Sequence, residues 1–128
     1  MKKRILVVDD EISIRMGIRE FAEYQGYDVT GAANGREALE LCRQQDFDLI
    51  IMDIMMPEMD GYEATERIRR LNRKDARTIP IIAMTANAFT EDKIRSKEAG
   101  MNEHIAKPLN TELVLRAVAK LVQPQMVD

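Results

Sequence analysis

The segment Asp48-Leu49-Ile50-Ile51-Met52-Asp53, which a turn at Pro57 follows, decides the fold of this chain. Its apolar run is rich in isoleucine and flanked by charge, a pattern typical of a strand buried on both faces of a parallel sheet. Asp53 ends this strand at the point where it leaves the core. Because ligands of open α/β sheets bind beyond the carboxyl ends of the strands, Asp53 is a candidate functional residue. A solvated carboxylate or a turn residue is the ordinary alternative for one such position.

Strand-like runs alternate with helix-like runs along the rest of the chain. Short apolar runs predict four further strands, at 5–8, 27–30, 81–84 and 104–106. Apolar residues at helical spacing predict a helix after residue 14, and possible N-caps open four more helices at Asn34, Asp60, Thr90 and Asn110. This strict alternation indicates an α/β fold, a five-stranded parallel sheet with helices on both faces. We expect residues 1–128 to form a single domain, since no linker or repeat divides them.

The same patterns predict which side chains face the core. We expect Cys42 to be a small core hydrophobe, and Met52 and Met84 to fill the core rather than a docking surface. The last helix is predicted to bury one face, made of Leu113, Ala117, Val118 and Leu121. The charged stretch from Arg67 to Arg77 is interpreted as a solvated face.

The composition argues against several classes of protein. The net charge is −3, with 45% hydrophobic and 32% charged residues, which suits a soluble globular protein. No basic field is present, so we expect no direct contact with nucleic acid or membrane. The apolar run Ile5–Val8 is too short for a secretory signal or a membrane span. The single cysteine cannot form an internal disulfide, and we therefore predict a cytoplasmic location.

Five polar residues occupy the C-terminal ends of four predicted strands: Asp9, Asp10, Asp53, Thr85 and Lys107. In a parallel sheet these strand ends lie along one edge. The three carboxylates would repel one another, since two unit charges about 4 Å apart cost on the order of 4 kcal/mol at an effective dielectric of about 20. A hard divalent cation removes that cost. The oxygen-only ligands, without a nearby His or Cys, favour Mg²⁺ over zinc.

These residues suit phosphoryl chemistry. Asp53 can attack phosphorus through its carboxylate oxygen, and it needs no general base because a carboxylate is already ionised at pH 7. The metal and Lys107 would neutralise charge on the transferring group, and Thr85 can donate its hydroxyl to a phosphoryl oxygen. Each residue has an ordinary alternative, such as a helix cap for Asp9 and Asp10 or a surface position for Lys107. Their coincidence at corresponding strand ends favours the functional interpretation.

Four stretches of the chain resemble the receiver domains of two-component response regulators. They are Ile5-Leu6-Val7-Val8-Asp9-Asp10-Glu11, Asp48–Asp53 with Met56-Pro57-Glu58-Met59-Asp60-Gly61, Met84-Thr85-Ala86, and Lys107-Pro108. They cover nearly the whole chain in the right order. The resemblance implies the flavodoxin-like receiver fold with strand order 2-1-3-4-5. It also implies a phosphorylation-dependent switch of a two-component system or phosphorelay.

The resemblance further implies a role for each acidic residue. Asp53 would be the phosphoacceptor, taking a phosphoryl group from a phosphohistidine on a histidine kinase or a histidine phosphotransfer protein. Asp10, Asp53 and the backbone carbonyl of Met55 would ligate Mg²⁺, and Asp9 would help through water. Apart from the resemblance, Met55 and Met56 follow Asp53 in a loop. Their position there leads to the hypothesis that an exposed thioether shields the acyl phosphate from water.

On the same grounds, Thr85 would be the switch hydroxyl and Lys107 would pair with the phosphate. The peptide bond between Lys107 and Pro108 would be cis, an isomer that only about 5–6% of X–Pro bonds adopt in folded proteins. His104 stands where many receivers carry a Tyr or Phe whose ring changes rotamer as the threonine moves. An imidazole is smaller and can hydrogen-bond or titrate near neutral pH. His104 is therefore either a switch residue or a partly exposed histidine with no switching role.

Two further interpretations concern the protein's context. The segments 83–89 and 99–101 look most like receivers attached to hybrid sensor histidine kinases, although a free-standing regulator is also compatible. Ile105, Leu109 and Val114, on the last strand and the last helix, form a face that would bind a partner or a second copy, making a homodimer. Plain core packing is the alternative for these three residues.

Two other functions compete with the signalling switch, which we do not expect to be an enzyme in its own right. A magnesium-dependent aspartyl phosphohydrolase usually has two aspartates one residue apart after its first strand and a cap over its site. Here Asp9 and Asp10 are adjacent, and the chain has no room for a cap. A flavin or nucleotide carrier needs a phosphate-binding loop after the first strand, where Asp9-Asp10-Glu11 would repel a phosphate.

Overall fold

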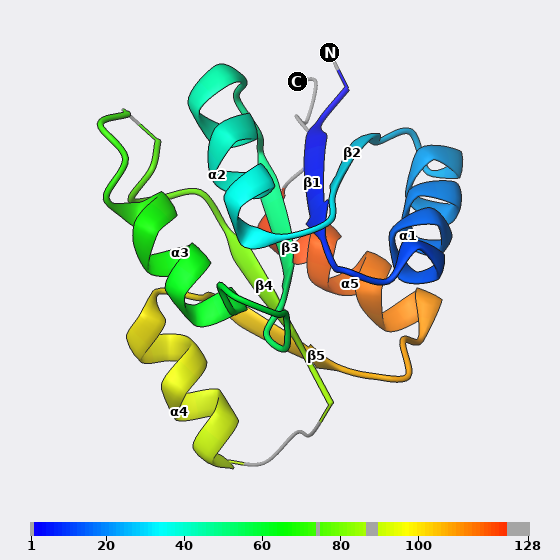
Figure 1. Ribbon diagram of the computed structural model, residues 1–128. Coiled ribbons are helices and arrows are strands. Elements are labelled where there is room, and N and C mark those ends of the chain that lie inside the picture. The colour runs from blue at the N-terminus through cyan, green and yellow to red at the C-terminus, as the bar shows by residue number, and fades with distance from the viewer. Residues whose placement is uncertain (1, 74, 87–89, 123–128) are drawn as a thin grey trace.

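The computed structural model describes residues 2–73, 75–86 and 90–122, apart from the side chains of residues 90–92. Strands and helices alternate along the chain (Figure 1). The strands are β1 (Arg4–Val8), β2 (Asp28–Ala32), β3 (Leu49–Asp53), β4 (Ile81–Thr85) and β5 (Glu103–Ala106). The helices are α1 (Ile12–Tyr24), α2 (Gly35–Gln44), α3 (Gly61–Arg69), α4 (Thr90–Ala99) and α5 (Thr111–Leu121). Among the described residues, no helix combines the length and the apolar character that crossing a bilayer requires.

The five strands form one parallel sheet in the order β2-β1-β3-β4-β5. This confirms the predicted α/β class and the strand order. β2 extends two residues beyond the predicted strand, because Gly31 and Ala32 continue the ladder opposite Val7 and Val8. The other four strands lie within one residue of their predicted bounds.

Apolar side chains alternate between the two faces of the sheet and form a core on each. In β1, Leu6 and Val8 face α2, α3 and α4, whereas Ile5 and Val7 face α1 and α5. Figure 1 shows these two groups of helices on opposite faces of the sheet. Met52, Met84 and Cys42 are buried, as the sequence predicts. Because both faces are covered, the strand ends that carry the site are held by a packed core.

Side-chain caps begin three of the helices at the predicted residues. Asn34, Asp60 and Asn110 each accept a hydrogen bond from the backbone N–H three residues on, at 2.8, 2.9 and 3.2 Å. The cap predicted at Thr90 involves a side chain outside the described ones. These caps fix where α2, α3 and α5 begin, and so set the loops that lead into them.

The predicted buried face of α5 is wrong at one position. Leu113 is 53% exposed, whereas Val114 and Val118 are each only 1% exposed. The buried stripe runs through Val114, Val118 and Val122 at a spacing of four residues, which rotates Leu113 to the outside. Val114 and Ile105 therefore belong to the core, and the half-buried Leu109 packs against it. Of the two interpretations left open for these residues, the structure favours core packing over a face for a partner.

Arg69 contradicts the interpretation of residues 67–77 as a solvated face. Its guanidinium donates hydrogen bonds to the carbonyl oxygens of Ile79 and Gly100 at 2.6 Å and Ala76 at 3.1 Å, and to Asn102 Oδ1 at 3.0 Å. Its planar fork of five N–H donors suits several acceptors at once. Arg69 thus ties α3 to the loop before β4 and to the loop before β5.

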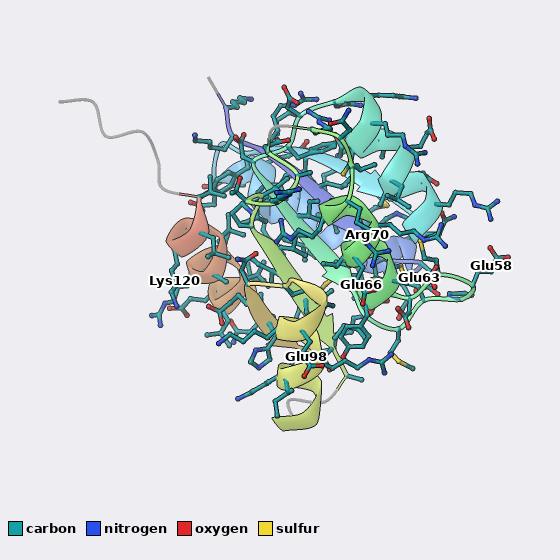
Figure 2. All side chains as sticks on the ribbon, turned by 90° about the vertical axis from the view of Figure 1, so that its left-hand side faces the viewer. Glu58, Glu63, Glu66, Arg70, Glu98 and Lys120 are labelled. Carbon is teal, nitrogen blue, oxygen red and sulfur yellow. The ribbon has the colours of Figure 1, made fainter. Side chains whose placement is uncertain are left out.

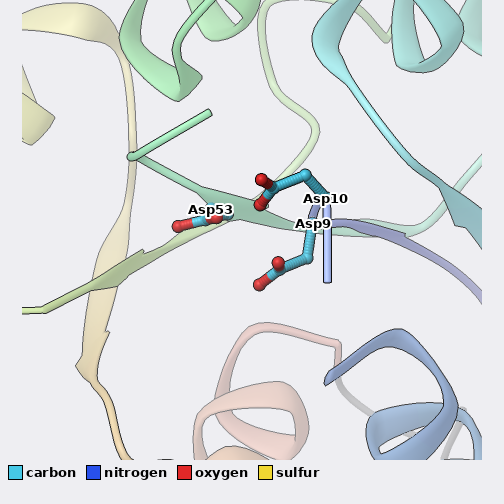
Figure 3. Close-up of side chains that lie close together, drawn as sticks. All are labelled: Asp9, Asp10 and Asp53. Carbon is cyan, nitrogen blue, oxygen red and sulfur yellow. The ribbon is translucent and has the colours of Figure 1, made fainter. Parts of the chain in front are cut away.

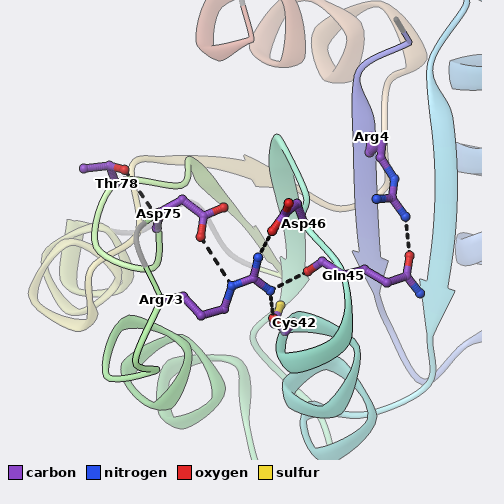
Figure 4. Close-up of polar contacts among 7 residues, drawn as sticks. All are labelled: Arg4, Cys42, Gln45, Asp46, Arg73, Asp75 and Thr78. Atoms are coloured by element: carbon purple, nitrogen blue, oxygen red, sulfur yellow. Dashed lines mark hydrogen bonds and ion pairs between the residues drawn. The ribbon is translucent and has the colours of Figure 1, made fainter.

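Arg73 has a similar role at the end of α2 (Figure 4). It donates to the carbonyl oxygens of Cys42 and Gln45 and pairs with Asp46 and Asp75. A helix leaves its last carbonyl groups without partners inside the helix, and Arg73 supplies donors for two of them. The sequence alone could not show this, because a run of charged residues has the same pattern whether or not individual side chains turn inward.

We predict that Arg69→Ala lowers the free energy of unfolding by about 2–4 kcal/mol, because it leaves several carbonyl oxygens without a donor. Urea denaturation monitored by circular dichroism measures this difference. The matched control is Arg70→Ala, since Arg70 is exposed and adjacent, and it should change the stability by less than about 0.5 kcal/mol. Equal effects of the two substitutions would contradict a structural role for Arg69.

Candidate functional site

Three carboxylates meet at the C-terminal edge of the sheet (Figure 3). β1 and β3 are paired with Val8 opposite Met52, which places Asp9 and Asp10 beside Asp53. One oxygen from each of Asp9, Asp10 and Asp53 lies within 4.8 Å of the others. Asp9 and Asp53 are buried, at 0% and 2% exposure, whereas Asp10 is exposed. The fold therefore brings the three acidic residues into one cluster that opens to solvent on the side of Asp10.

Lys107 is the cation that faces this cluster. Its Nζ lies 3.0 Å from Asp9 Oδ2, 3.5 Å from Asp53 Oδ1 and 3.9 Å from Glu11 Oε1. Burial alone would lower the pKa of Lys107, but the hydrogen bond with Asp9 and the nearby charges of Asp53 and Glu11 raise it above its usual value. Lys107 is therefore charged, and it neutralises only part of the negative charge of the cluster.

The carboxyl group of Asp53 has a raised pKa. Burial raises its pKa from 3.8 to about 6, and the charges of Asp9 and Asp10 act in the same direction. Lys107 and the backbone N–H of Met55 lower the pKa, but by less. The ionised form of Asp53 is thus held in an unfavourable environment, which a metal cation would improve.

Backbone contacts fix the loop that follows Asp53. The N–H of Met55 donates to Asp53 Oδ1 at 3.2 Å, and the N–H of Gly61 donates to the carbonyl of Ile54 at 3.0 Å. A Cβ atom at Gly61 would lie only 2.3 Å from the carbonyl oxygen of Asp53, so only glycine fits there. Gly61 belongs to one of the stretches that resemble receiver domains. The sequence alone does not explain why glycine is required there, because the reason is the close approach of two backbone segments.

Asp9 has partners that the sequence interpretation missed. Its Oδ1 accepts the backbone N–H of Glu11 at 2.9 Å, and its backbone carbonyl accepts a hydrogen bond from the Arg15 guanidinium at 2.7 Å. Asp9 does not cap α1 with its side chain, because α1 begins after Glu11 without any side-chain cap. The buried Asp9 is thus a fixed part of the site, whereas the exposed Asp10 has more room to accept a ligand.

The other predicted residues lie on β4, on β5 and after it. Thr85 ends β4, is 4% exposed, and its carbonyl accepts the backbone N–H of Lys107 at 2.7 Å. His104 pairs with Ala83 across β4 and β5, on the sheet face that α4 covers, and its side chain is half-buried. The peptide bond between Lys107 and Pro108 is cis, as the resemblance implies.

The two methionines in the loop after Asp53 differ in exposure, since Met55 is 71% exposed but Met56 only 8%. Met56 therefore lacks the exposed thioether that was predicted to shield the acyl phosphate from water.

The sequence places this fold and site in a known family: residues 5–119 match the response regulator receiver domain. The chain belongs to this family. The receiver domain is 34% identical, over 95% of its length, to the probable transcriptional regulator ycf29 of Porphyra purpurea, of which it covers 57%. The chain spans about half the length of the curated relatives it matches.

Solved structures of receivers agree closely with this one. Chemotaxis protein CheY4 of Vibrio cholerae is 34% identical with a TM-score of 0.89, covering 94% of this chain and 99% of that one. The receiver domain of sensor histidine kinase PA1611 from Pseudomonas aeruginosa PAO1 is 35% identical with a TM-score of 0.86, covering 97% and 100%. That structure has a magnesium ion coordinated in its active site cleft. Receiver domains are phosphorylation-dependent two-component switches that take phosphoryl groups from histidine kinases or phosphotransfer proteins.

We predict that Asp53→Asn stabilises the metal-free protein by about 2–3 kcal/mol at pH 7–8. Because the folded pKa of Asp53, about 6, exceeds its value of 3.8 in the unfolded chain, the folded state binds the extra proton between these values. The wild type should therefore lose stability as the pH rises from about 4 to 6, and the variant should not. Denaturation in EDTA across this range measures the difference. A gain equally large at pH 3.5 would contradict the titration of Asp53 as its cause.

Proposed function

We propose that this receiver domain accepts a phosphoryl group on Asp53 and thereby switches a two-component system or phosphorelay. The observation that carries the proposal is the convergence of Asp53 with two further carboxylates and with Lys107 Nζ at 3.5 Å. A carboxylate oxygen of Asp53 forms a bond to phosphorus while the P–N bond of the donor phosphohistidine breaks and the imidazole departs. Lys107 is placed to neutralise charge on the transferring group. Thr85, at the end of β4, is proposed as the hydroxyl that contacts the phosphoryl oxygen.

We propose Mg²⁺ as the cofactor, held by Asp10, Asp53 and the backbone carbonyl of Met55, with Asp9 acting through water. Three carboxylates with oxygens within 4.8 Å, and only one lysine among them, fit a hard divalent cation. When bound, the metal neutralises charge on the incoming phosphoryl group. The magnesium in the PA1611 receiver supports this proposal by similarity.

The donor is proposed to be a histidine kinase or a histidine phosphotransfer protein. We also propose that this receiver resembles those of hybrid sensor kinases, with a free-standing regulator as the alternative. The CheY4 and PA1611 receivers, at 34% and 35% identity, favour neither context. A cytoplasmic location and the absence of direct contact with nucleic acid belong to the same proposal, supported by the single cysteine and the net charge of −3. A homodimer through the last strand and the last helix stays a proposal, and it would use the half-buried residues of β5 and exposed residues of α5 such as Leu113.

We predict that a small phosphodonor such as acetyl phosphate, with Mg²⁺, gives an acid-stable and base-labile adduct on the wild type. Asp53→Asn should abolish the adduct because it removes the carboxylate oxygen that is proposed to attack phosphorus. Asp10→Asn should raise the Mg²⁺ concentration needed, because it removes a proposed ligand. Asp28→Asn is the matched control, since Asp28 is exposed at the opposite end of the sheet and should leave the adduct unchanged. Mass spectrometry of the intact protein measures each case.

This experiment also separates the switch from the alternative of an aspartyl phosphohydrolase. A switch retains the adduct as its signal, and we propose that this domain is not a turnover enzyme. Continuous hydrolysis of the donor without any trapped adduct would favour the hydrolase. An adduct on the Asp53→Asn protein would show that another residue is the acceptor.

We predict that Met55→Glu accelerates dephosphorylation severalfold, because Met55 is 71% exposed beside Asp53 and a polar side chain would admit water to the acyl phosphate. The loss of adduct after removal of the donor measures this rate. Met16→Glu is the control, since Met16 is similarly exposed, at 60%, on α1. An unchanged rate in Met55→Glu would show that the thioether does not shield the phosphate.

A further inference from the structure

The loop between β1 and α1 carries two of the three clustered carboxylates, and few contacts hold it. The sheet ladder ends at Asp9, whose N–H donates to the carbonyl oxygen of Ala32 at 3.1 Å. Helix α1 begins after Glu11 without the side-chain cap that α2, α3 and α5 have. Asp10 lies between these points, and its exposed side chain has no hydrogen bond or ion pair within the described part of the chain. The position of Asp10 therefore depends on the peptide group that joins it to Asp9.

Arg15 holds this peptide group from α1. Its guanidinium donates a hydrogen bond of 2.7 Å to the carbonyl oxygen of Asp9, and a charged donor makes such a bond stronger than one between neutral groups. The oxygen belongs to the same planar unit as the nitrogen and the Cα atom of Asp10. The bond therefore restricts rotation of the whole unit, and with it the point from which the Asp10 side chain extends. No carboxylate of the described residues pairs with Arg15, so its guanidinium serves the loop rather than a salt bridge.

Gly31 of β2 leaves open the path along which the Arg15 side chain reaches the loop. A Cβ atom added at Gly31 would lie 3.4 Å from Arg15 Cδ and 3.7 Å from its Nε. Gly31 is paired with Val7 near the end of β1, so this contact lies beside the acidic loop. A Cβ atom alone would still fit, but the Cγ atoms of a valine would enter the space that Arg15 occupies. A larger residue at position 31 would thus displace the guanidinium without changing any residue of the site.

We propose that Arg15 is a positioning residue, which acts through the carbonyl group of Asp9 to hold Asp10 in place for Mg²⁺. This role rests on the proposed function, since it requires Asp10 to be a ligand of that ion. Mg²⁺ demands short bonds in near-ideal octahedral geometry, so a ligand that can move costs affinity. The larger Ca²⁺ accepts a more flexible geometry, so it depends less on the same restraint.

Titration of the full 128-residue chain with Mg²⁺, followed by the NMR shifts of its backbone amides, tests the proposal. Arg15→Ala should weaken Mg²⁺ binding about tenfold, because groups that orient metal ligands typically contribute 10–100-fold to affinity. The same substitution should weaken Ca²⁺ binding less. A general loss of structure would instead impair both ions alike and would alter amide shifts throughout the protein before any metal is added.

Two controls remove the same charge elsewhere. Arg19→Ala lies on the same helix, where Arg19 is exposed and pairs with Glu23 at 3.4 Å. Arg70→Ala lies at the C-terminal end of α3, where Arg70 is exposed (Figure 2). Both variants should retain wild-type affinity for Mg²⁺ within about twofold, since exposed charges far from the site are screened by salt.

Gly31→Val separates the positioning role from a contribution to stability. Glycine weakens a strand and valine favours it, so the metal-free variant should be at least as stable as the wild type. Its Mg²⁺ affinity should nevertheless fall about threefold or more, because valine displaces the Arg15 side chain. Urea denaturation in EDTA and the Mg²⁺ titration measure the two effects. In the Arg15→Ala background, Gly31→Val should cause no further loss of affinity, because the side chain that it displaces is already absent.

The outcomes distinguish this role from the metal site itself. No binding of Mg²⁺ by the wild type would overturn the proposed metal site, and the role of Arg15 with it. Binding by the wild type together with equal binding by Arg15→Ala would overturn only the role of Arg15. Equal weakening in Arg15→Ala and Arg19→Ala would also overturn that role, because it would show a response to net charge alone.

Discussion

Repulsion among three carboxylates at one edge of the sheet is the constraint on which the rest of this structure depends. Two like charges about 5 Å apart cost on the order of 3 kcal/mol at an effective dielectric of about 20, and Lys107 offsets only part of this. Burial is the largest cause of the raised pKa of Asp53, and the negative charges of Asp9 and Asp10 raise it further. The fold holds Asp53 in this environment because β1 and β3 are buried on both faces and cannot separate. A cation that binds at this site would reduce the repulsion among the carboxylates and so stabilise the folded protein.

The surrounding structure is built to keep that arrangement rigid. Arg69 and Arg73 satisfy backbone carbonyl groups of loops and helix ends far from the site, so the segments that lead into β4 and β5 are fixed. Gly61 lets α3 begin in contact with the backbone of Asp53. Since Lys107 reaches the cluster from the end of β5, a shift in any of these segments would change its distance to Asp53. The geometry of the site is therefore a property of the whole fold.

Most of the fold and the site residues could be predicted from the sequence, because each rests on a local pattern. Buried parallel strands have a continuous apolar run, caps have short polar side chains, and the carboxyl ends of parallel strands meet by topology. The errors occur where packing decides between neighbouring positions. On α5, a rotation of the buried stripe by one residue buries Val114 in place of Leu113. Arg69 turns inward because several carbonyl oxygens surround its guanidinium. Such information is not contained in residue spacing.

The loop between Asp53 and α3 connects the proposed phosphorylation site with the first turn of α3. Asp60 caps α3. A Cβ atom added at the next residue, Gly61, would lie 2.3 Å from the carbonyl oxygen of Asp53. The backbones of Asp53 and Gly61 are therefore in close contact, so we expect a backbone displacement at Asp53 to shift the first turn of α3. Tyr62 stands in that first turn and contacts Arg95 of α4. Any ligand whose affinity depends on the position of Tyr62 would thus be linked thermodynamically to events at Asp53, and the linkage acts equally in both directions.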